Sequence, residues 1–535
     1  MVVGAFWCVV LIGIPFWWKT TEVYRADLPM AEIESWQSSN TRRFVIPTTM
    51  HIHLPATLEH TDHHLLDSLQ TVLEHRLTEL QPSSPCLDFT VSVRTAFWQN
   101  QENEDVSQLL ERHKEGHIGE YHVYMTTLSS PADTEKHHVI IGNQRTSVIE
   151  TSVLTKDTVI TTVLQVVPNI FFKEFDLLSK TACGEQDVVK NDVDNMRPFK
   201  YSSRYQITFS LMNNNPTGTI VDWDIRRAVN NYLYPFLNEL SCLYNFTVDS
   251  QIQNYASLTM TPKYKQRQDK PSYYYFEPQQ LPHFVNSAEW NLASTISSYP
   301  TVNFILYIPS TEESPLRIHD AQGNPLLSNA FLIPRWGGIA IKNVPSSAQH
   351  GDHYQLALKD LQPIMKVFIA QLRGLMGIQE LKAGTDDMNV SFIPARQSGV
   401  TILEKDNLIR KRTIENVVNA ISTLKSLAQL VNEIPNMVVL DHIDLQVRQS
   451  LHALNRVGEA LRLGDYAKAL RESIEAVELS EKSFFDPTMV SMLYFPDEHK
   501  YAIYMPLFVP VSVPLIMALI KQVKKLRGSP KAKTE

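Results

Sequence analysis

The sequence predicts a mixed α/β domain that continues into a helical segment and is flanked by two transmembrane helices. Three observations support this fold class. Uncharged apolar runs occupy both ends of the 535-residue chain. Between them, strand-like and helix-like patterns alternate as far as residue 400, which is typical of a layered α/β fold. Beyond residue 400 only helical patterns remain before the second apolar run.

The terminal runs have the length of membrane-spanning helices. Residues 1–18 and 501–520 contain no charged side chain. As helices they would reach about 27 and 30 Å, close to the thickness of a bilayer's hydrocarbon core. We therefore expect transmembrane helices at 1–18 and 501–520 and a basic tail at 521–535. Between them we expect an α/β domain at 19–400, which could consist of two halves split near residue 200, and a helical segment at 401–490.

Flanking charges and glycosylation sequons predict the orientation of the chain. The tail after Ile520 carries six basic residues and one acid, and basic residues beside a membrane span favour the cytosolic side. Both termini are then cytosolic, and the long central part lies in a secretory lumen. N-glycosylation sequons at Asn245 and Asn389 agree with this location, although two sequons also occur by chance in a chain of this length.

A cleaved signal peptide is the alternative for the first apolar run. The run lacks a basic start and ends in Phe16, Trp17 and Trp18 instead of a small-residue cleavage site. Tryptophans at this position suit the interfacial belt of a membrane helix. We therefore expect an uncleaved anchor, although Lys19 and Arg25 mildly oppose a luminal loop after it.

The α/β part contains two successive series of elements. In the first series, apolar and polar residues alternate like strands, and one run of leucines has helical spacing. The second series repeats this style after residue 200. The first comprises strands at 42–54, 89–98, 122–128 and 137–143, a helix at 62–80 and a helix or mixed run at 158–175. The second comprises strands at 205–212, 246–253 and 302–310, helices at 222–245 and 353–377, the latter interrupted near Pro363, and an irregular connection at 255–300.

Three helices form the segment after residue 400. Residues 403–434 carry apolar side chains at three- and four-residue steps, including Ile414, Ile421 and Leu424. Helices at 447–464 and 465–485 follow and form a hairpin that turns at Gly464, with Asp465 as the N-cap. The hairpin resembles one turn of a tetratricopeptide repeat, but no 34-residue period accompanies it. We expect a three-helix stalk that leads to the second membrane segment.

Charge and cysteine content narrow the possible functions. The net charge is −8, and without the basic tail it is −13, which argues against a nucleic-acid partner. Cys8 lies in the first apolar run and leaves Cys86, Cys183 and Cys242. One pair could form in an oxidising compartment, leaving one thiol free or bridged to another chain, and the sequence leaves the pairing open. No cysteine spacing matches a zinc motif.

Histidines concentrate early in the chain, where they could suggest a metal site. Eleven of the 18 histidines precede residue 150. His51 and His53 would share one face of a strand, His63 and His64 follow Asp62, and His113 and His117 have the i, i+4 spacing of a helical metal pair. The order differs from H-E-x-x-H, and the clusters lie among charged residues. We therefore expect solvated faces and no bound metal or cofactor.

No motif predicts catalysis by this chain. The sequence has no G-x-S-x-G nucleophile elbow, no P-loop, no G-x-G-x-x-G and no cysteine-protease signature. Asp222 and Asp224 are similar to the D-x-D motif with which sugar-nucleotide transferases chelate a metal. We expect instead that they open a helix, where acidic side chains favour the N-terminal dipole. Residues 334–338 predict a tight turn with a buried tryptophan, with a docking surface as the alternative.

Four stretches carry a family resemblance. PFWWKTTEVYRADLP (15–29), YQITFSLMNNNP (205–216), NAFLIPRWGGI (329–339) and SEKSFFDPTMVSMLYFPDEHKYAIYMPLFVPVSVP (480–514) resemble the PIG-S family. The resemblance spans almost the whole chain, and the last block is the most specific. The sequence differs from the family in lacking a hydrophilic stretch before the first anchor and in its His-rich region around 50–140.

The resemblance implies a role in attaching glycosylphosphatidylinositol (GPI) anchors to proteins. Members of the family are non-catalytic scaffold subunits of the GPI transamidase of the endoplasmic reticulum membrane, which replaces the C-terminal signal of a precursor protein with a preassembled GPI. The implied partners are a caspase-like cysteine-protease catalytic subunit, an aminopeptidase-like subunit, PIG-T, PIG-U, membrane lipids and, indirectly, the precursor. Two alternatives are a luminal glycosyltransferase that uses Asp222 and Asp224, and a luminal adaptor unrelated to GPI.

Overall fold

A computed structural model describes most of the chain between Tyr24 and Arg527. Within these bounds the structure leaves out 38–42, 59–64, 82–83, 99–105, 113–115, 128–136, 184–201, 218–219, 267–270, 287–289, 291, 293–298, 346–352, 379–387, 435–436 and 492–496. Of the preceding residues it describes 7–8, 11–13, 15–16 and 19, so the predicted helix at 1–18 lies largely outside the described residues.

The chain forms two compact units. One comprises Met1–Arg42, Val417–Arg456 and Glu472–Glu535, and the other comprises Arg43–Asn416 and Val457–Arg471. Because the units are discontinuous in sequence, three long helices contribute residues to both of them. These helices are α10 (Ile402–Glu433), α11 (Asp441–Arg462) and α12 (Tyr466–Phe484). The domain boundaries expected from the sequence stay predictions.

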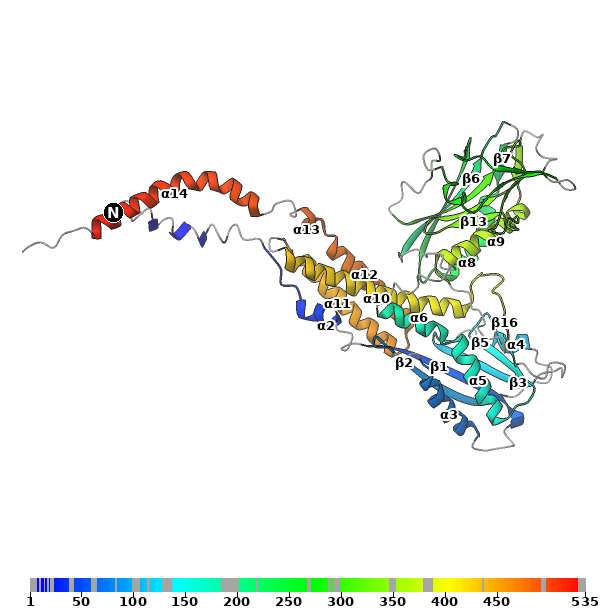
Figure 1. Cartoon of the computed structure of the whole chain (residues 1–535). Helices are drawn as coiled ribbons and strands as arrows, with labels where there is room; N and C mark the ends of the chain where they lie inside the picture. The colour runs from blue at the N-terminus through cyan, green and yellow to red at the C-terminus, as the bar shows by residue number, and fades with distance from the viewer. Residues whose placement is uncertain are drawn as a thin grey trace, which may run out of the picture. The chain divides into compact units, whose positions relative to one another are not determined.

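The larger unit contains a six-stranded sheet with helices on both faces (Figure 1). Its strand order is β16-β4-β5-β3-β1-β2, and all neighbours are parallel except β4 and β5. On β1, Met50 and Ile52 are buried, whereas His51 and His53 on the opposite face are half-buried, so the sequence alternation sets the core face. The strands are β1 (Phe44–Pro55), β2 (Leu87–Trp98), β3 (Glu120–Thr127), β4 (His137–Ile141), β5 (Thr146–Thr151) and β16 (Met388–Phe392), and the helices are α3 (Leu65–Glu79), α4 (Val106–Glu111), α5 (Lys156–Ile170) and α6 (Lys173–Ala182).

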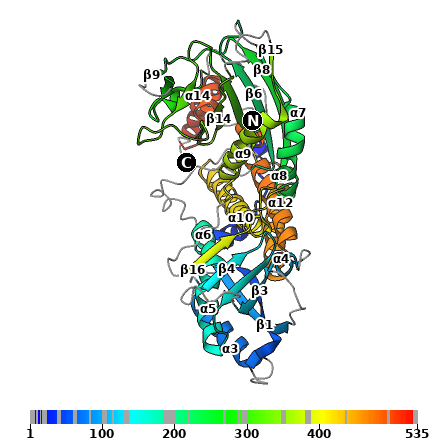
Figure 2. The same ribbon diagram turned by 90° about the vertical axis from the view of Figure 1, so that its right-hand side faces the viewer.

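A five-stranded sheet in the same unit has the order β13-β14-β11-β6-β8 (Figure 2). Its strands are parallel except for the edge strand β13. The order along the chain is the same as in the first sheet, since β6, β8, β11, β13 and β14 take the places of β1 to β5 in turn. The elements are β6 (Arg204–Asn213), α7 (Ile225–Ala228), a π-helical turn (Val229–Leu233), α8 (Tyr234–Glu239), β8 (Asn245–Asn254), β11 (Thr301–Ile308), β13 (Ala330–Ile333), β14 (Gly337–Ile341) and α9 (Leu358–Leu375).

Three sequence expectations in the second series are wrong. Residues 255–300 are not an irregular connection throughout, because β9 (Lys263–Lys265) and β10 (Tyr273–Phe276) form a small sheet with β12 (Leu316–Ile318), over a core that includes Phe276 and Phe284. The expected helix at 222–245 starts only at Ile225, because β7 (Ile220–Trp223) pairs with β15 (His353–Leu356). Helix α9 is not interrupted at Pro363, which lies inside it. The first two errors arise because the partner strands β12 and β15 lie far away in sequence.

The turn at residues 334–338 is present and joins β13 to β14. Arg335 has a φ of +60°, and Trp336 is half-buried instead of buried as expected. A Cβ atom at Gly337 would lie 1.8 Å from the carbonyl oxygen of Asn303, and one at Gly338 would lie 1.9 Å from Gln371 Oε1. The two glycines therefore allow β14 to approach β11 and α9 closely.

The predicted helices after residue 400 are confirmed as α10, α11 and α12. Gly464 has a φ of +72° at the turn, and the Lys468 N–H donates to Asp465 Oδ1 at 2.9 Å, which makes Asp465 the expected N-cap. In the smaller unit, α10 buries Val417, Leu424 and Val431, whereas Ile421 is only half-buried. That unit also contains α2 (Met30–Gln37), α13 (Pro487–Ser491) and α14 (Asp497–Arg527), which includes Pro506, Pro510 and Pro514. Within the described residues, no helix has both the length and the apolar character that crossing a membrane requires.

The buried stripe of α10 yields a stability prediction. Leu424 is 1% exposed, and the adjacent Lys425 is exposed. Leu424→Asp should destabilise the protein by at least about 3 kcal/mol, because it removes an apolar contact and buries a carboxylate. Lys425→Asp should change the free energy of unfolding by less than about 0.5 kcal/mol. Chemical denaturation of the two purified variants measures the difference, and equal midpoints would show that the stripe is misassigned.

Candidate functional site

A cleft lies in the larger unit, beside the start of β1. It has a volume of about 650 Å³ and is lined by Pro47 and Thr49, the loop before β3, and the α11–α12 turn. The Tyr466 hydroxyl donates to the Pro47 carbonyl at 2.6 Å, and both residues line the cleft. A Cβ atom at Gly119, which has a φ of +88°, would lie 3.0 Å from the Tyr466 ring, so a glycine lets the loop pass there.

A cluster of imidazoles continues from the cleft along the same face of the sheet. Thr49 of β1 pairs with Glu120 of β3, and two residues further along His51 pairs with His122. The rings of His51 and His122 stack with centroids 4.6 Å apart, and His53 Nε2 lies 3.0 Å from His122 Nδ1. The prediction that His51 and His53 share a face is therefore confirmed, and His122 is the member that the sequence analysis missed. The strand alternation around residue 122 was the available signal.

The imidazole cluster is an aromatic surface of stacked rings. Burial lowers the pKa of His51 and Arg94 adds to this effect, although Glu120 opposes it. The rings of His51, His53 and His122 lie within 16° of parallel. Within the described part of the chain, no three His, Cys, Asp or Glu side chains could hold a metal ion. Asp62, His63, His64 and His113 lie outside the described residues.

A fully buried arginine holds α10 against the first sheet. The Arg410 side chain is 1% exposed, and its Nη2 donates to Tyr121 Oη at 2.8 Å, Glu174 Oε2 at 3.2 Å and Asn407 Oδ1 at 2.9 Å. The guanidinium also lies 5.8 Å from the centroid of the Tyr466 ring. Burial raises the pKa of Tyr466 to about 12 against the opposing charge of Arg410, so this phenol stays protonated and bonded to Pro47. The packing of α10 and the shape of the cleft therefore depend on one network.

The two predicted glycosylation sites lie on exposed positions of strands. Asn245 is the first residue of β8, and its backbone N–H donates to the Ser203 carbonyl at 2.9 Å. Asn389 lies in β16 opposite His138 of β4. Both asparagine residues are exposed. Glycosylation at Asn245 and Asn389 stays a prediction.

Asp222 and Asp224 have local roles. Asp222 lies in β7, not at a helix start as expected, because Val221 and Trp223 are buried and the strand pairs with β15. Its Oδ1 accepts the Trp223 N–H at 2.7 Å. Asp224 precedes α7 at the N-cap position and pairs with Arg227 at 3.3 Å. These contacts give both carboxylates local partners.

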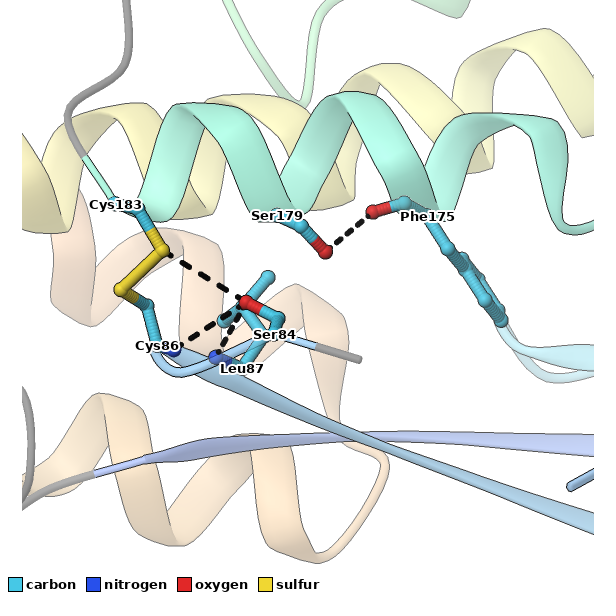
Figure 3. Close-up of a disulfide and its surroundings, with 6 residues drawn as sticks. All are labelled: Ser84, Cys86, Leu87, Phe175, Ser179 and Cys183. Atoms are coloured by element: carbon cyan, nitrogen blue, oxygen red, sulfur yellow. Dashed lines mark hydrogen bonds between the residues drawn. A yellow bond between two sulfur atoms is a disulfide. The ribbon is translucent and has the colours of Figure 1, made fainter. Parts of the chain in front are cut away.

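A disulfide joins Cys86 at the start of β2 to Cys183 at the end of α6 (Figure 3). Ser84 lies between the two segments, and its Oγ accepts the backbone N–H groups of Cys86 and Leu87 at 3.3 and 3.2 Å. Cys242 carries a free thiol, and desolvation raises the pKa of this thiol. A thiol with a raised pKa is protonated at neutral pH and is a poor nucleophile. The pairing that the sequence left open is thus Cys86 with Cys183.

Comparison with known proteins identifies one family along the whole chain. Residues 4–529 match the family model PIG-S, phosphatidylinositol-glycan biosynthesis class S protein. The chain is 35% identical to the GPI-anchor transamidase component PIGS of Bos taurus and 34% identical to that of Homo sapiens, each over 97% of this chain and 94% of the relative. It is 28% identical to the GPI transamidase component GPI17 of Saccharomyces cerevisiae, over 96% of this chain and 90% of the relative.

The Arg410 network yields a second stability prediction. Arg410→Ala leaves Glu174 buried without its cation and should cost roughly 3–5 kcal/mol. The matched control is Arg227→Ala, which breaks an ion pair whose arginine side chain is 76% exposed and should cost at most about 1 kcal/mol. Urea denaturation of each variant provides the comparison. Similar losses for the two substitutions would contradict the assignment of Arg410 as the buried anchor of α10.

Proposed function

The chain belongs to the PIG-S family, and we propose that it acts as a non-catalytic scaffold inside the GPI transamidase. It is a subunit of this complex, because its relatives over nearly their full length are named as components of the GPI transamidase. As a scaffold, the chain would position other subunits and would not carry out the transfer reaction. The match along almost the whole chain is the observation that carries the proposal.

The cysteines support a non-catalytic role. A transamidation through a thioester requires a thiolate nucleophile. Cys86 and Cys183 are consumed by their disulfide, and the raised pKa of the Cys242 thiol keeps it protonated. Cys8 lies in the apolar N-terminal run. We propose that a separate caspase-like cysteine-protease subunit supplies the nucleophile, and that an aminopeptidase-like subunit, PIG-T and PIG-U are the other partners, as the family resemblance implies.

A rescue experiment tests this role. Cells that lack the chain should lose GPI-anchored proteins from their surface, and the parent chain should restore them. Cys242→Ser and the double variant Asp222→Asn with Asp224→Asn should restore surface display to within about twofold of the parent, because neither changes a proposed contact with the reaction. Flow cytometry of a GPI-anchored reporter gives the readout. A variant that folds, copurifies with the caspase-like subunit and yet blocks anchoring would refute the scaffold role.

We also propose that the chain is anchored in the endoplasmic reticulum membrane by its two ends, with the bulk of the chain luminal. The uncharged run at 501–520 lies within α14, many of whose apolar side chains are exposed, including Ile503 and Met517. Lys521 and Lys524 follow on the proposed cytosolic side. The Cys86–Cys183 disulfide supports an oxidising compartment for the domain, because such bonds are rare in the cytosol.

Protease protection tests this topology. In sealed microsomes, added protease should remove an epitope placed after Glu535 and leave the central part intact. Glycosidase should increase electrophoretic mobility, and Asn245→Gln with Asn389→Gln should abolish that shift. Detergent provides the control, because it should make the central part accessible. Digestion of the central part in sealed vesicles would rule out a luminal location.

A further inference from the structure

The five-stranded sheet changes the direction of its connections at β6. The chain passes from β6 to β8 on one side, and then to β11 on the other side of β6. Strands β6, β8, β11 and β14 are parallel, so their carboxyl ends meet at one edge. Open α/β sheets bind ligands outside the carboxyl ends of the strands, at the point where the order reverses. In this sheet that point lies between the ends of β6 and β11.

A crevice is present at this point. It is lined by the end of β6 at Asn213, the residues that follow β11 at Pro309 and Thr311, and Val344 after β14. Its enclosed part measures about 20 Å³, which holds one water molecule or one hydroxyl group. Asn214 is half-buried, and Thr311 and Asn215 are exposed, so the narrow part opens onto a polar surface.

Asn213, which lines the crevice, carries a buried polar atom without a hydrogen-bond partner among the described residues. The residue is 2% exposed, and its Nδ2 donates to the Val221 carbonyl at 3.0 Å and to Asn254 Oδ1 at 2.8 Å. These two bonds fix the orientation of the amide, and Asn213 Oδ1 has no hydrogen-bond partner among the described residues. Leaving a buried acceptor unpaired is unfavourable, so a donor that reaches this oxygen through the crevice would gain a hydrogen bond.

The surroundings indicate a neutral ligand that is rich in hydroxyl groups. The described residues that line the crevice are amides, hydroxyls and apolar groups without a basic side chain, which disfavours phosphates. The Asn214 Nδ2 group lies 3.4 Å from Glu313 Oε2, and burial, with a further contribution from Glu312, raises the pKa of that carboxyl. Amides and hydroxyls both donate and accept hydrogen bonds, as the hydroxyls of a sugar do.

An exposed aromatic ring lies at the same edge. Tyr255 follows Asn254 at the end of β8, is 69% exposed and has a φ of +57°, which is uncommon for a residue other than glycine. The next residue, Ala256, donates its backbone N–H to the Asn213 carbonyl at 2.9 Å and ties this segment to the end of β6. Exposed aromatic faces pack against the C–H faces of sugar rings, which gives such a tyrosine a use.

We propose that the carboxyl edge of β6 and β11 binds a glycan, with one sugar hydroxyl donating to Asn213 Oδ1. The remaining hydroxyls of that sugar lie over Asn214 and Thr311, and Tyr255 packs against an adjacent ring. The glycan comes either from a glycolipid or from an N-linked glycoprotein, because both present the same neutral hydroxylated rings. The inference rests on the geometry of the sheet and does not require the scaffold role to be correct.

Saturation-transfer NMR on the full-length chain tests the site. The chain is purified in a detergent without a sugar headgroup, and two probes are titrated: an oligomannose N-glycan released from glycoprotein, and a GPI glycan freed of its lipid. We expect millimolar or tighter binding of at least one probe. Thr311→Val removes one hydroxyl from an exposed position and should weaken that binding about threefold to tenfold. Tyr255→Ala should weaken it by a similar factor.

Matched controls separate recognition from folding. Tyr264→Ala removes a tyrosine that is 57% exposed on the separate small sheet and should leave binding unchanged. All variants should unfold at the same temperature as the parent. Binding of only the GPI glycan assigns the glycolipid as the source, and binding of only the N-glycan assigns glycoprotein. The proposal would be overturned if neither probe bound, because the crevice would then hold water only. It would also be overturned if the Thr311→Val and Tyr255→Ala variants bound the probes as tightly as the parent chain. Copurification with other subunits tests the scaffold role separately.

Discussion

The first half of α10 is the constraint on which the larger unit depends. Its buried charges reach elements of both sheets. On the side of the first sheet, Arg145 binds Asp406 through two hydrogen bonds of 2.6 and 2.8 Å, and Arg410 contacts β3 and α6. Towards the second sheet, Arg412 donates to Tyr244 Oη at 2.8 Å and to the carbonyl that follows α9 at 2.7 Å. A buried charge is costly unless its partner is in place, so these pairs fix the position of α10 along and around its axis.

Helices and strands whose hydrophobic pattern is local could be predicted from the sequence. Alternation predicted β1 and β2, and the apolar stripe predicted α10, because each pattern reports which face is buried. The same reasoning failed where a distant segment decides the outcome, as for Asp222 in β7. It also failed to identify Arg410, because a charged residue on a helix is ordinarily solvated and its partners Tyr121 and Glu174 lie more than 230 residues earlier in the chain. The crevice at Asn213 escaped prediction for a related reason, since only the strand order brings β6 beside β11.

The two sheets share a topology but use their equivalent edges differently. In the first sheet, the carboxyl ends of β1 and β3 are filled by His53 stacked on Tyr124, which packs with Trp98 and the leucines of α4. Apolar packing closes this edge. In the second sheet the equivalent edge carries the amide of Asn213 and remains polar. The same strand order therefore serves two purposes: the carboxyl edge of the first sheet stabilises the fold, and that of the second sheet is the proposed ligand site. This agrees with the principle that function depends on the residues of a site and not on the fold.

The disulfide fixes the end of the helix that supplies Glu174 to the network of Arg410. Cys183 directly follows α6, the helix that carries Glu174, and is its C-cap residue. Without a link, this C-terminal end of α6 could fray and withdraw the carboxylate from Arg410. The bond to Cys86 closes a loop with a sequence separation of 97 residues, which in the chain-entropy model stabilises the folded state by roughly 4–5 kcal/mol. That stabilisation is of the same order as the cost of leaving a buried ion pair incomplete. The stability of the first sheet and the packing of α10 therefore depend on a disulfide that needs an oxidising environment. This dependence supports the luminal location proposed for the domain.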